Sequence, residues 1–259
     1  MNIVIAIASV VIKEMCRRKD FYVLFVLTAL ITLLSGSVNF FGDDKIARYV
    51  KEICLLMIWI SSLVIAVGPA ARQIPAEREN RTIFPLLAKP VTRAQFILGK
   101  FLGCWAVSGF ALLVLYLFFA LVSGLREQNW PVAQFVQASC LHWMMLGIVI
   151  GMVLLGSVVF TAPSVNWTVS LIVVVGILFL GEHLNKVAER MTAPTGTLLA
   201  AIYYLIPHLE WYDIRDLLIY NKKPVAVWAF ILAGAYAAVY TAFFLLATGL
   251  VFRRKPLTI

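Results

Sequence analysis

Apolar positions follow one another in long uninterrupted runs, and five of these runs contain no charged residue. They cover residues 21–42, 53–71, 101–124, 138–181 and 224–252. A helix that crosses the hydrocarbon core of a bilayer, which is about 30 Å thick, needs about 20 apolar residues. The pattern therefore predicts an all-α integral membrane protein.

The fourth run, 138–181, is long enough for two crossings. It is interrupted at residues 161–166, Thr-Ala-Pro-Ser-Val-Asn, which include turn-forming residue types. We therefore expect a tight hairpin with one spanning helix over 138–160 and another over 166–181. The prediction becomes six spanning helices in a single domain, 1–259, and an even number of crossings places both termini on the same side of the membrane.

The segment before the first run has a different pattern. Small and polar residues recur at helical steps, at Asn2, Ala6, Ser9, Lys13 and Arg17, so they share one face of a helix. The cations follow the apolar part of this segment, whereas those of a cleavable signal peptide precede it. Residues 1–20 are predicted to form an interfacial elbow helix. A frayed N-terminal tail is the alternative.

Two polar segments are too long to be simple connectors. Residues 72–100 carry six cations, two carboxylates and three prolines, which predicts helical pieces separated by turns. Residues 182–223 contain a mostly apolar stretch, Thr197 to Ile206, that is too short to span a bilayer. We expect this stretch to be re-entrant or interfacial.

Composition agrees with the membrane interpretation. Hydrophobic residues make up 62% of the chain and charged residues 14%, with a mean hydropathy of +0.93. A typical soluble domain has about 25% charged residues. The composition therefore excludes an ordinary soluble domain, because so few charges cannot cover its surface.

The distribution of charge predicts the orientation. With the N-terminus inside, the cytoplasmic segments hold thirteen cations and four anions, and the outer segments hold nine of each. Short cytoplasmic loops carry the excess of Lys and Arg, so we expect both termini and residues 72–100 in the cytoplasm and residues 182–223 outside. The basic segments then face anionic membrane lipid, and we expect no nucleic-acid partner.

Residues that could perform chemistry are scarce. Gly99-Lys100 is followed by Phe101 and lacks the glycine pattern of a P-loop, so the chain has no nucleotide site of its own. Neither a Gly-x-Ser-x-Gly nor a His-Glu-x-x-His motif occurs. The histidines are expected at helix ends or in the outer segment, and the cysteines lack paired spacing. We expect no catalytic residue, cofactor or metal. These residues are His142, His183 and His208, and Cys16, Cys54, Cys104 and Cys140.

Two other classes of protein stay open. A channel or proton-coupled carrier normally places ionisable residues within its spans, and we expect the six predicted spans to contain none, with the histidines at helix ends or in the outer segment. An intramembrane enzyme acting on lipid would have to use outer residues such as Glu182, His183, Glu210 or Asp213. Their spacing does not favour a site over a solvated face.

Polar residues share one face of the first predicted span. Thr28, Thr32, Ser35 and Asn39 lie three or four residues apart. Polar groups at membrane depth usually face a bundle or a cavity, so these residues are candidates to line a pathway. Alternatively, the hydroxyls bond to carbonyls of their own helix and Asn39 lies at the outer interface.

Pairs of small residues four apart occur in three of the predicted helices. This spacing lets two helices approach closely, and we expect it to serve packing within the bundle. The pairs are Gly99 and Gly103, Gly147 and Gly151, and Ala233 and Ala237.

The segment from Ile74 to Lys100 resembles the loop between the second and third helices of ABC-2-type transporter permeases. The shared features are Glu-x-Glu, an Arg-Thr pair, a Leu-Leu turn, a Lys-Pro-Val-Thr-Arg block and a Gly-Lys pair. They stand at Glu77, Glu79, Arg81-Thr82, Leu86-Leu87, residues 89–93 and Gly99-Lys100. Many members have glycine in place of Arg81, so the chain looks closer to the branch that includes the permeases of nitrous-oxide-reductase maturation and gliding motility.

The resemblance implies a permease subunit of an ATP-driven exporter in the bacterial cytoplasmic (inner) membrane. It implies pairing with a second permease copy, as a homodimer, and with two copies of a separate ABC ATPase subunit, which would bind ATP and Mg. It also implies that the elbow helix and the 72–100 loop contact the ATPase and that the first, second and fifth helices line the pathway. The charges available for coupling are Glu77, Glu79, Arg81 and Arg93.

Overall fold

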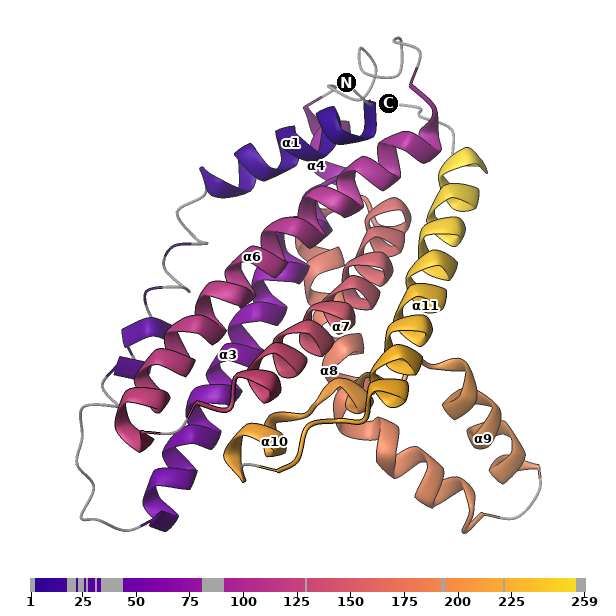
Figure 1. The fold of residues 1–259 in the computed structure, drawn as a ribbon. Coiled ribbons are helices and arrows are strands. Elements are labelled where there is room, and N and C mark those ends of the chain that lie inside the picture. Colours follow the sequence, from indigo (N-terminus) through magenta and orange to yellow (C-terminus); the bar gives the residue numbers. More distant parts are fainter. Residues whose placement is uncertain are drawn as a thin grey trace.

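The computed structural model describes residues 3–17, 44–80, 91–128, 130–191, 194–220 and 222–254, together with residues 22, 26, 28–30 and 32–33. Every regular element in these ranges is helical (Figure 1). In chain order they are α1 (Ile3–Cys16), α3 (Asp44–Arg72), α4 (Pro75–Glu79), α6 (Arg93–Glu127), α7 (Val132–Val159), α8 (Pro163–Ala188), α9 (Thr195–Leu205), η1 (Leu209–Tyr212), α10 (Arg215–Ile219) and α11 (Val227–Arg254).

Four described helical stretches are long and apolar enough to cross a membrane. They are Arg48–Glu79, Arg93–Leu125, Val132–Val159 and Val227–Arg254. Shorter apolar helices cover Pro163–Phe179 and Thr195–Leu205. The first predicted span, 21–42, lies mostly outside the described residues, and the few of its residues that are described are helical. The long helices extend beyond the uncharged runs. A charged residue marks the end of the membrane-spanning part, but it does not interrupt the helix, which continues past the membrane.

The long helices lie side by side, and α7 is the central one (Figure 1). It packs against α3, α6, α8 and α11, and most of its length is buried. By contrast, α11 is almost entirely exposed on its apolar side, which is the surface expected of a helix that faces lipid. The bundle therefore has one largely buried helix with the others around it.

Different segments of the chain lie at the two ends of this bundle. α1, α4, the start of α6 and the end of α11 lie at one end, here named the α1 end (Figure 1). The start of α3, α9, η1 and α10 lie at the other, the α9 end. The start of α1 and the end of α11 thus meet at the same end of the bundle.

The predicted hairpin over 138–181 is present. α7 ends at Val159 and α8 begins at Pro163, where a missing N–H costs nothing because the first helical turn has no intrahelical acceptor. The second helix, predicted over 166–181, begins earlier, at Pro163, so Asn166 lies in the first turn of α8. Its side-chain amide is fully buried and donates to the carbonyls of Ala71 and Val153, so it ties α8 to α3 and α7.

The small residues pack helices within the chain, as expected. A Cβ added at Gly99 or Gly103 would lie within 3 Å of Ile7 or Val11, because α1 crosses the first turns of α6 there. Residues 3–16 are thus an ordered helix seated on α6.

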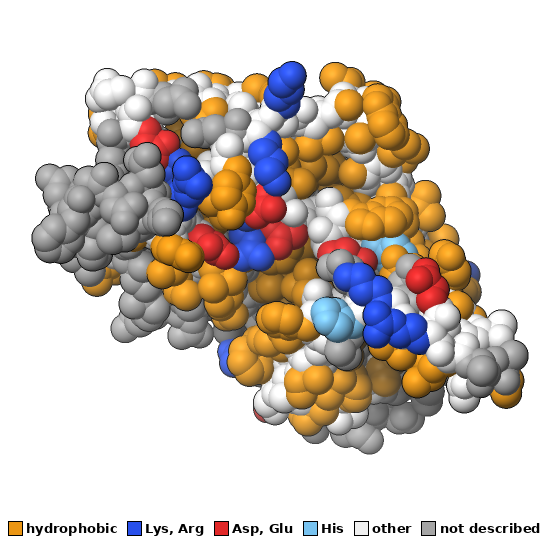
Figure 2. Space-filling model, turned by 90° about the horizontal axis from the view of Figure 1, so that it is seen from below, with side chains coloured by type: hydrophobic (Ala, Val, Ile, Leu, Met, Phe, Trp, Pro, Cys, Tyr) orange, Lys and Arg blue, Asp and Glu red, His pale blue; other side chains and the backbone are white. Residues whose placement is uncertain are grey.

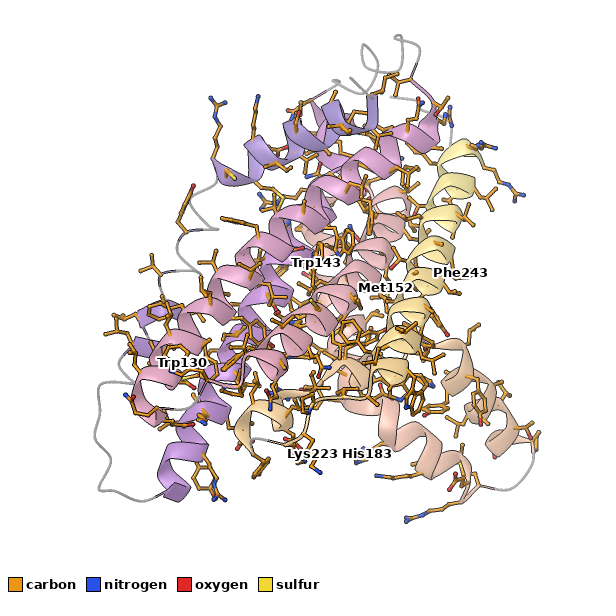
Figure 3. The ribbon with its side chains drawn as sticks, viewed as in Figure 1. Trp130, Trp143, Met152, His183, Lys223 and Phe243 are labelled. Carbon is orange, nitrogen blue, oxygen red and sulfur yellow. The ribbon has the colours of Figure 1, made fainter. Side chains whose placement is uncertain are left out.

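A pair of tryptophans joins α6 to α7 beside Gly109. Their rings stack at 4.3 Å, and each indole N–H donates to the backbone carbonyl of the other residue at 3.0 Å. This reciprocal pair is Trp105 and Trp143, the second of which is labelled in Figure 3. A Cβ at Gly109 would lie only 2.2 Å from the Trp143 indole nitrogen, so only glycine leaves room for the pair.

Candidate functional site

The α1 end holds the described part of the permease-like segment, and its hydrogen bonds explain how α6 begins. The Thr92 hydroxyl accepts from the Gln95 backbone N–H at 3.2 Å, and the Gln95 side chain accepts from the Thr92 N–H at 3.0 Å. This capping box satisfies two donors that a helix N-terminus leaves free. Residues 93–100 are therefore the first two turns of α6 and belong to a rigid helix.

Arg93 connects the start of α6 to the end of α11. Its guanidinium donates to the backbone carbonyls of Phe252 and Arg253, the latter at 3.1 Å, and lies 5.3 Å from the centre of the Phe252 ring. The last carbonyls of a helix lack intrahelical donors and carry partial negative charge. Arg93 thus caps α11, which is a role inside the chain.

Glu77 of α4 forms a salt bridge with Lys100 of α6. Side-chain exposure is 4% for Lys100 and 18% for Glu77, so the pair is largely desolvated. The Lys100 ammonium also lies 5.6 Å from the centre of the Phe96 ring, where the ring quadrupole attracts a cation. The short helix α4 is therefore fastened to α6 by a buried charge pair.

The remaining predicted coupling residues differ in position. Glu79 is exposed at the end of α4, so its carboxylate is on the molecular surface. Arg81 lies outside the described residues. The predicted set of four thus divides into Glu77 and Arg93, which bind other elements of this chain, and Glu79, which faces outward.

The predicted polar face of the first span is described at two positions. The Thr28 hydroxyl lies 2.6 Å from the Ser61 hydroxyl of α3, and the Thr32 hydroxyl donates to the Thr28 carbonyl at 2.9 Å. Both threonines are buried. Thr32 therefore makes the bond within its own helix that was the alternative, while Thr28 reaches a neighbouring helix. Ser35 and Asn39 lie outside the described residues, and a pathway role for the set remains a prediction.

One buried polar cluster was missed by the sequence reasoning. His142 was expected at a helix end because the uncharged run begins at residue 138. However, α7 begins at Val132, so His142 lies well inside the helix, and it is buried at 1% exposure. An ionisable residue therefore does lie within a predicted span. The signal was a histidine inside an otherwise apolar run.

Hydrogen bonds around His142 define its tautomer. The Ser62 hydroxyl donates to the Trp59 carbonyl at 2.8 Å, so it accepts from His142 Nε2–H, also at 2.8 Å. His142 Nδ1 then accepts from the Tyr116 hydroxyl at 3.3 Å. The Trp59 ring stacks on the imidazole at 4.7 Å. A neutral imidazole satisfies every partner, and the cluster joins α3, α6 and α7.

Charged side chains gather at the α9 end, which Figure 2 views directly. Arg215 forms a two-pronged ion pair with Asp213, at 2.6 Å and 2.8 Å, and its guanidinium lies 5.4 Å from the centre of the Trp59 ring. Because Arg215 donates these hydrogen bonds to the Asp213 carboxylate, the Arg215 pKa is raised above its ordinary value. This ion pair therefore lies against the Trp59 side chain of α3.

Of the residues considered for a lipid-acting enzyme, Glu182 has a side chain outside the described part of the structure, and the other three have different surroundings. His183 is exposed on the last turns of α8 (Figure 3), and Asp213 is engaged by Arg215. Glu210 lines a small cavity. In the described part of the chain, no group of three His, Cys, Asp or Glu side chains could hold a metal ion.

This chain is a multi-span membrane protein by class. It has long apolar helices, charges at the two ends of the bundle and a short helix fastened at the α1 end. A model of the ABC-2 family transporter protein family matches residues 5–257. The chain belongs to this family, whose members are membrane components of ABC transporters that lack a nucleotide-binding domain and work with a separate ATPase subunit. The match does not extend to the branch suggested by Arg81. A search of curated proteins gave no match.

Proposed function

We propose that this chain is the permease subunit of an ATP-driven exporter in the bacterial inner membrane, with both termini and the α1 end in the cytoplasm. In this proposal two copies form a homodimer and two separate ATPase subunits, which bind ATP and Mg, dock at the α1 end. Family membership supports the transport role, and the excess of cations in the segments of the α1 end supports its cytoplasmic position.

The observation that carries the proposal is the buried pair between Glu77 and Lys100. α4 has only five residues, which is too short to hold its position by its own backbone hydrogen bonds. The salt bridge makes it move with α6, so a push on α4 reaches a spanning helix directly.

Two further contacts extend the connection from α6. Arg93 holds the end of α11, and α1 packs its Ile7 and Val11 side chains directly against Gly99 and Gly103. A displacement of the start of α6 therefore also displaces α11 and α1. We propose that Glu79, exposed at the end of α4, makes the contact with the ATPase, and that Arg81 adds to it.

The pathway is proposed to follow the first span and α3. The contact between Thr28 and Ser61 supports this position, because it brings polar side chains from two helices together at membrane depth. Thr32, Ser35 and Asn39 would continue the same polar face toward the α9 end.

Reversal of charge at Glu79 tests the docking surface. Glu79→Lys should abolish co-purification of the ATPase subunit, because a charge-assisted hydrogen bond across the interface would become a repulsion. Asp216→Lys, at an exposed carboxylate of the opposite end, is the matched control and should retain the ATPase. Equal recovery of the ATPase with both variants would refute docking at α4.

A further inference from the structure

We propose that the α9 end carries a binding site for an organic ammonium group, with Glu210 as its counter-ion. The site is independent of the coupling role, since it lies at the opposite end of the bundle. It is a cavity of about 220 Å³ between α8, α9 and the segment that follows α9. Its lining includes Val173, Gly176, Ile177, Tyr203, His208 and Glu210.

Among the residues that the structure describes, Glu210 supplies the one carboxylate in the lining of this cavity. Its Oε2 atom is buried and has no hydrogen-bond partner, and no salt bridge to Glu210 exists among the described residues. A buried carboxylate oxygen without a donor is unfavourable by about 1–3 kcal/mol or more. A bound cation or hydrogen-bond donor would give this oxygen atom the partner that it lacks.

Two aromatic rings, those of Tyr203 and His208, line the same cavity as Glu210. The Tyr203 and His208 rings stack at 4.3 Å, and the Trp211 ring meets His208 edge-on at 4.9 Å. Aromatic faces attract alkylammonium groups, which have diffuse charge and apolar surface. Together with the carboxylate they form the two elements of an ammonium site.

The rest of the lining determines the class of cation. Val173, Ile177 and Ile206 present apolar surface, which suits the carbon atoms attached to an ammonium nitrogen. A hard metal ion such as Ca²⁺ instead requires six to eight oxygen ligands, and the cavity offers one carboxylate. The chemistry therefore favours an amine with attached carbon groups, from a lipid headgroup or from a soluble compound.

Glycines leave the space that the ligand would occupy. A Cβ added at Gly176 meets no atom within 4 Å, so a leucine there would fill the cavity without moving the backbone. Gly249 of α11 has equally open surroundings but lies outside this cavity, which makes it a matched control.

The purified full-length chain in detergent micelles tests the site by thermal unfolding and titration calorimetry. Soluble probes are tetramethylammonium and ethanolamine, with NaCl and CaCl2 as references. In a second arm the chain is placed in nanodiscs of phosphatidylethanolamine or of phosphatidylglycerol. We expect at least one ammonium probe to raise the melting temperature above its reference, and the responding arm identifies the source as soluble or lipid.

Substitutions test whether the ammonium probe binds in this cavity. Glu210→Gln and Gly176→Leu should each weaken binding at least tenfold, whereas Asp216→Asn and Gly249→Leu should bind as the parent does. Without ligand, Glu210→Gln should melt at the parental temperature or above it, because it removes an unpartnered charge. The proposal is overturned if no ammonium probe stabilises the protein, or if CaCl2 stabilises it more strongly. It is also overturned if Glu210→Gln binds as the parent does, or if this variant without ligand melts at a lower temperature than the parent.

Discussion

Replacement of Lys100 by methionine should release α4 from the bundle. Methionine keeps most of the apolar length of the lysine side chain, so the change removes the charge with little loss of packing. It removes the Lys100 ammonium from the Glu77 carboxylate, whose side chain is 18% exposed. The loss of one member of a buried ion pair typically costs about 3–5 kcal/mol, and we expect about 3 kcal/mol because water still reaches part of this carboxylate.

Equilibrium unfolding in mixed detergent micelles, followed by tryptophan fluorescence, measures this cost. The double variant Lys100→Met with Glu77→Gln should recover most of the lost stability, since it removes both charges of the pair together. Lys51→Met is the control, because its pair with Glu127 is more exposed, at 13% and 29%, and should cost at most about 1 kcal/mol.

The same variants test coupling. Lys100→Met should still bind the ATPase through Glu79, yet the assembled complex should lose transport, because α4 would move without α6. Stability of Lys100→Met within about 0.5 kcal/mol of both the parent and the double variant would refute the fastening of α4 by this pair. Unchanged transport by a variant that is destabilised as expected would instead refute the mechanical role of the pair.

Three further predictions concern topology, pathway and packing. Single cysteines at Glu79 and Asp213 should differ in labelling by an impermeant thiol reagent on intact cells, with only the second labelled; equal labelling would overturn the orientation. Thr32→Leu should insert and assemble normally but lower transport, whereas a parental rate at equal abundance would refute a pathway role for Thr32. Gly109→Ala should cost about 1–3 kcal/mol by overpacking against an indole ring, while Gly249→Ala, with open surroundings, should unfold as the parent does.

Much of the fold follows from local pattern. Uncharged runs predicted the long helices, and the interruption at residues 161–166 predicted the hairpin between α7 and α8, because lipid requires the apolar surface and satisfied backbone that only a helix of this length provides. The glycine spacing at Gly99 and Gly103 predicted close packing within the chain, which α1 supplies. Helix ends were harder to predict, since charges end a span but do not end a helix.

The candidate site shows where such reasoning stops. The charges of the permease-like segment were identifiable, but their partners were not. Glu77 meets Lys100 across 23 positions of sequence, and Arg93 meets the end of α11 across about 160. Long-range pairs of this kind depend on how helices are placed, which no local periodicity encodes.

His142 illustrates the same division. The sequence by itself determined that this chain is a membrane protein with long helices, because the hydrophobic effect and backbone hydrogen bonding act on each segment separately. Only the tertiary structure decided that His142 is enclosed by Ser62, Tyr116 and Trp59, and that Glu77 faces inward while Glu79 faces outward. Polar side chains inside a bundle are positioned by partners on other helices, and those partners come together only when the bundle has formed.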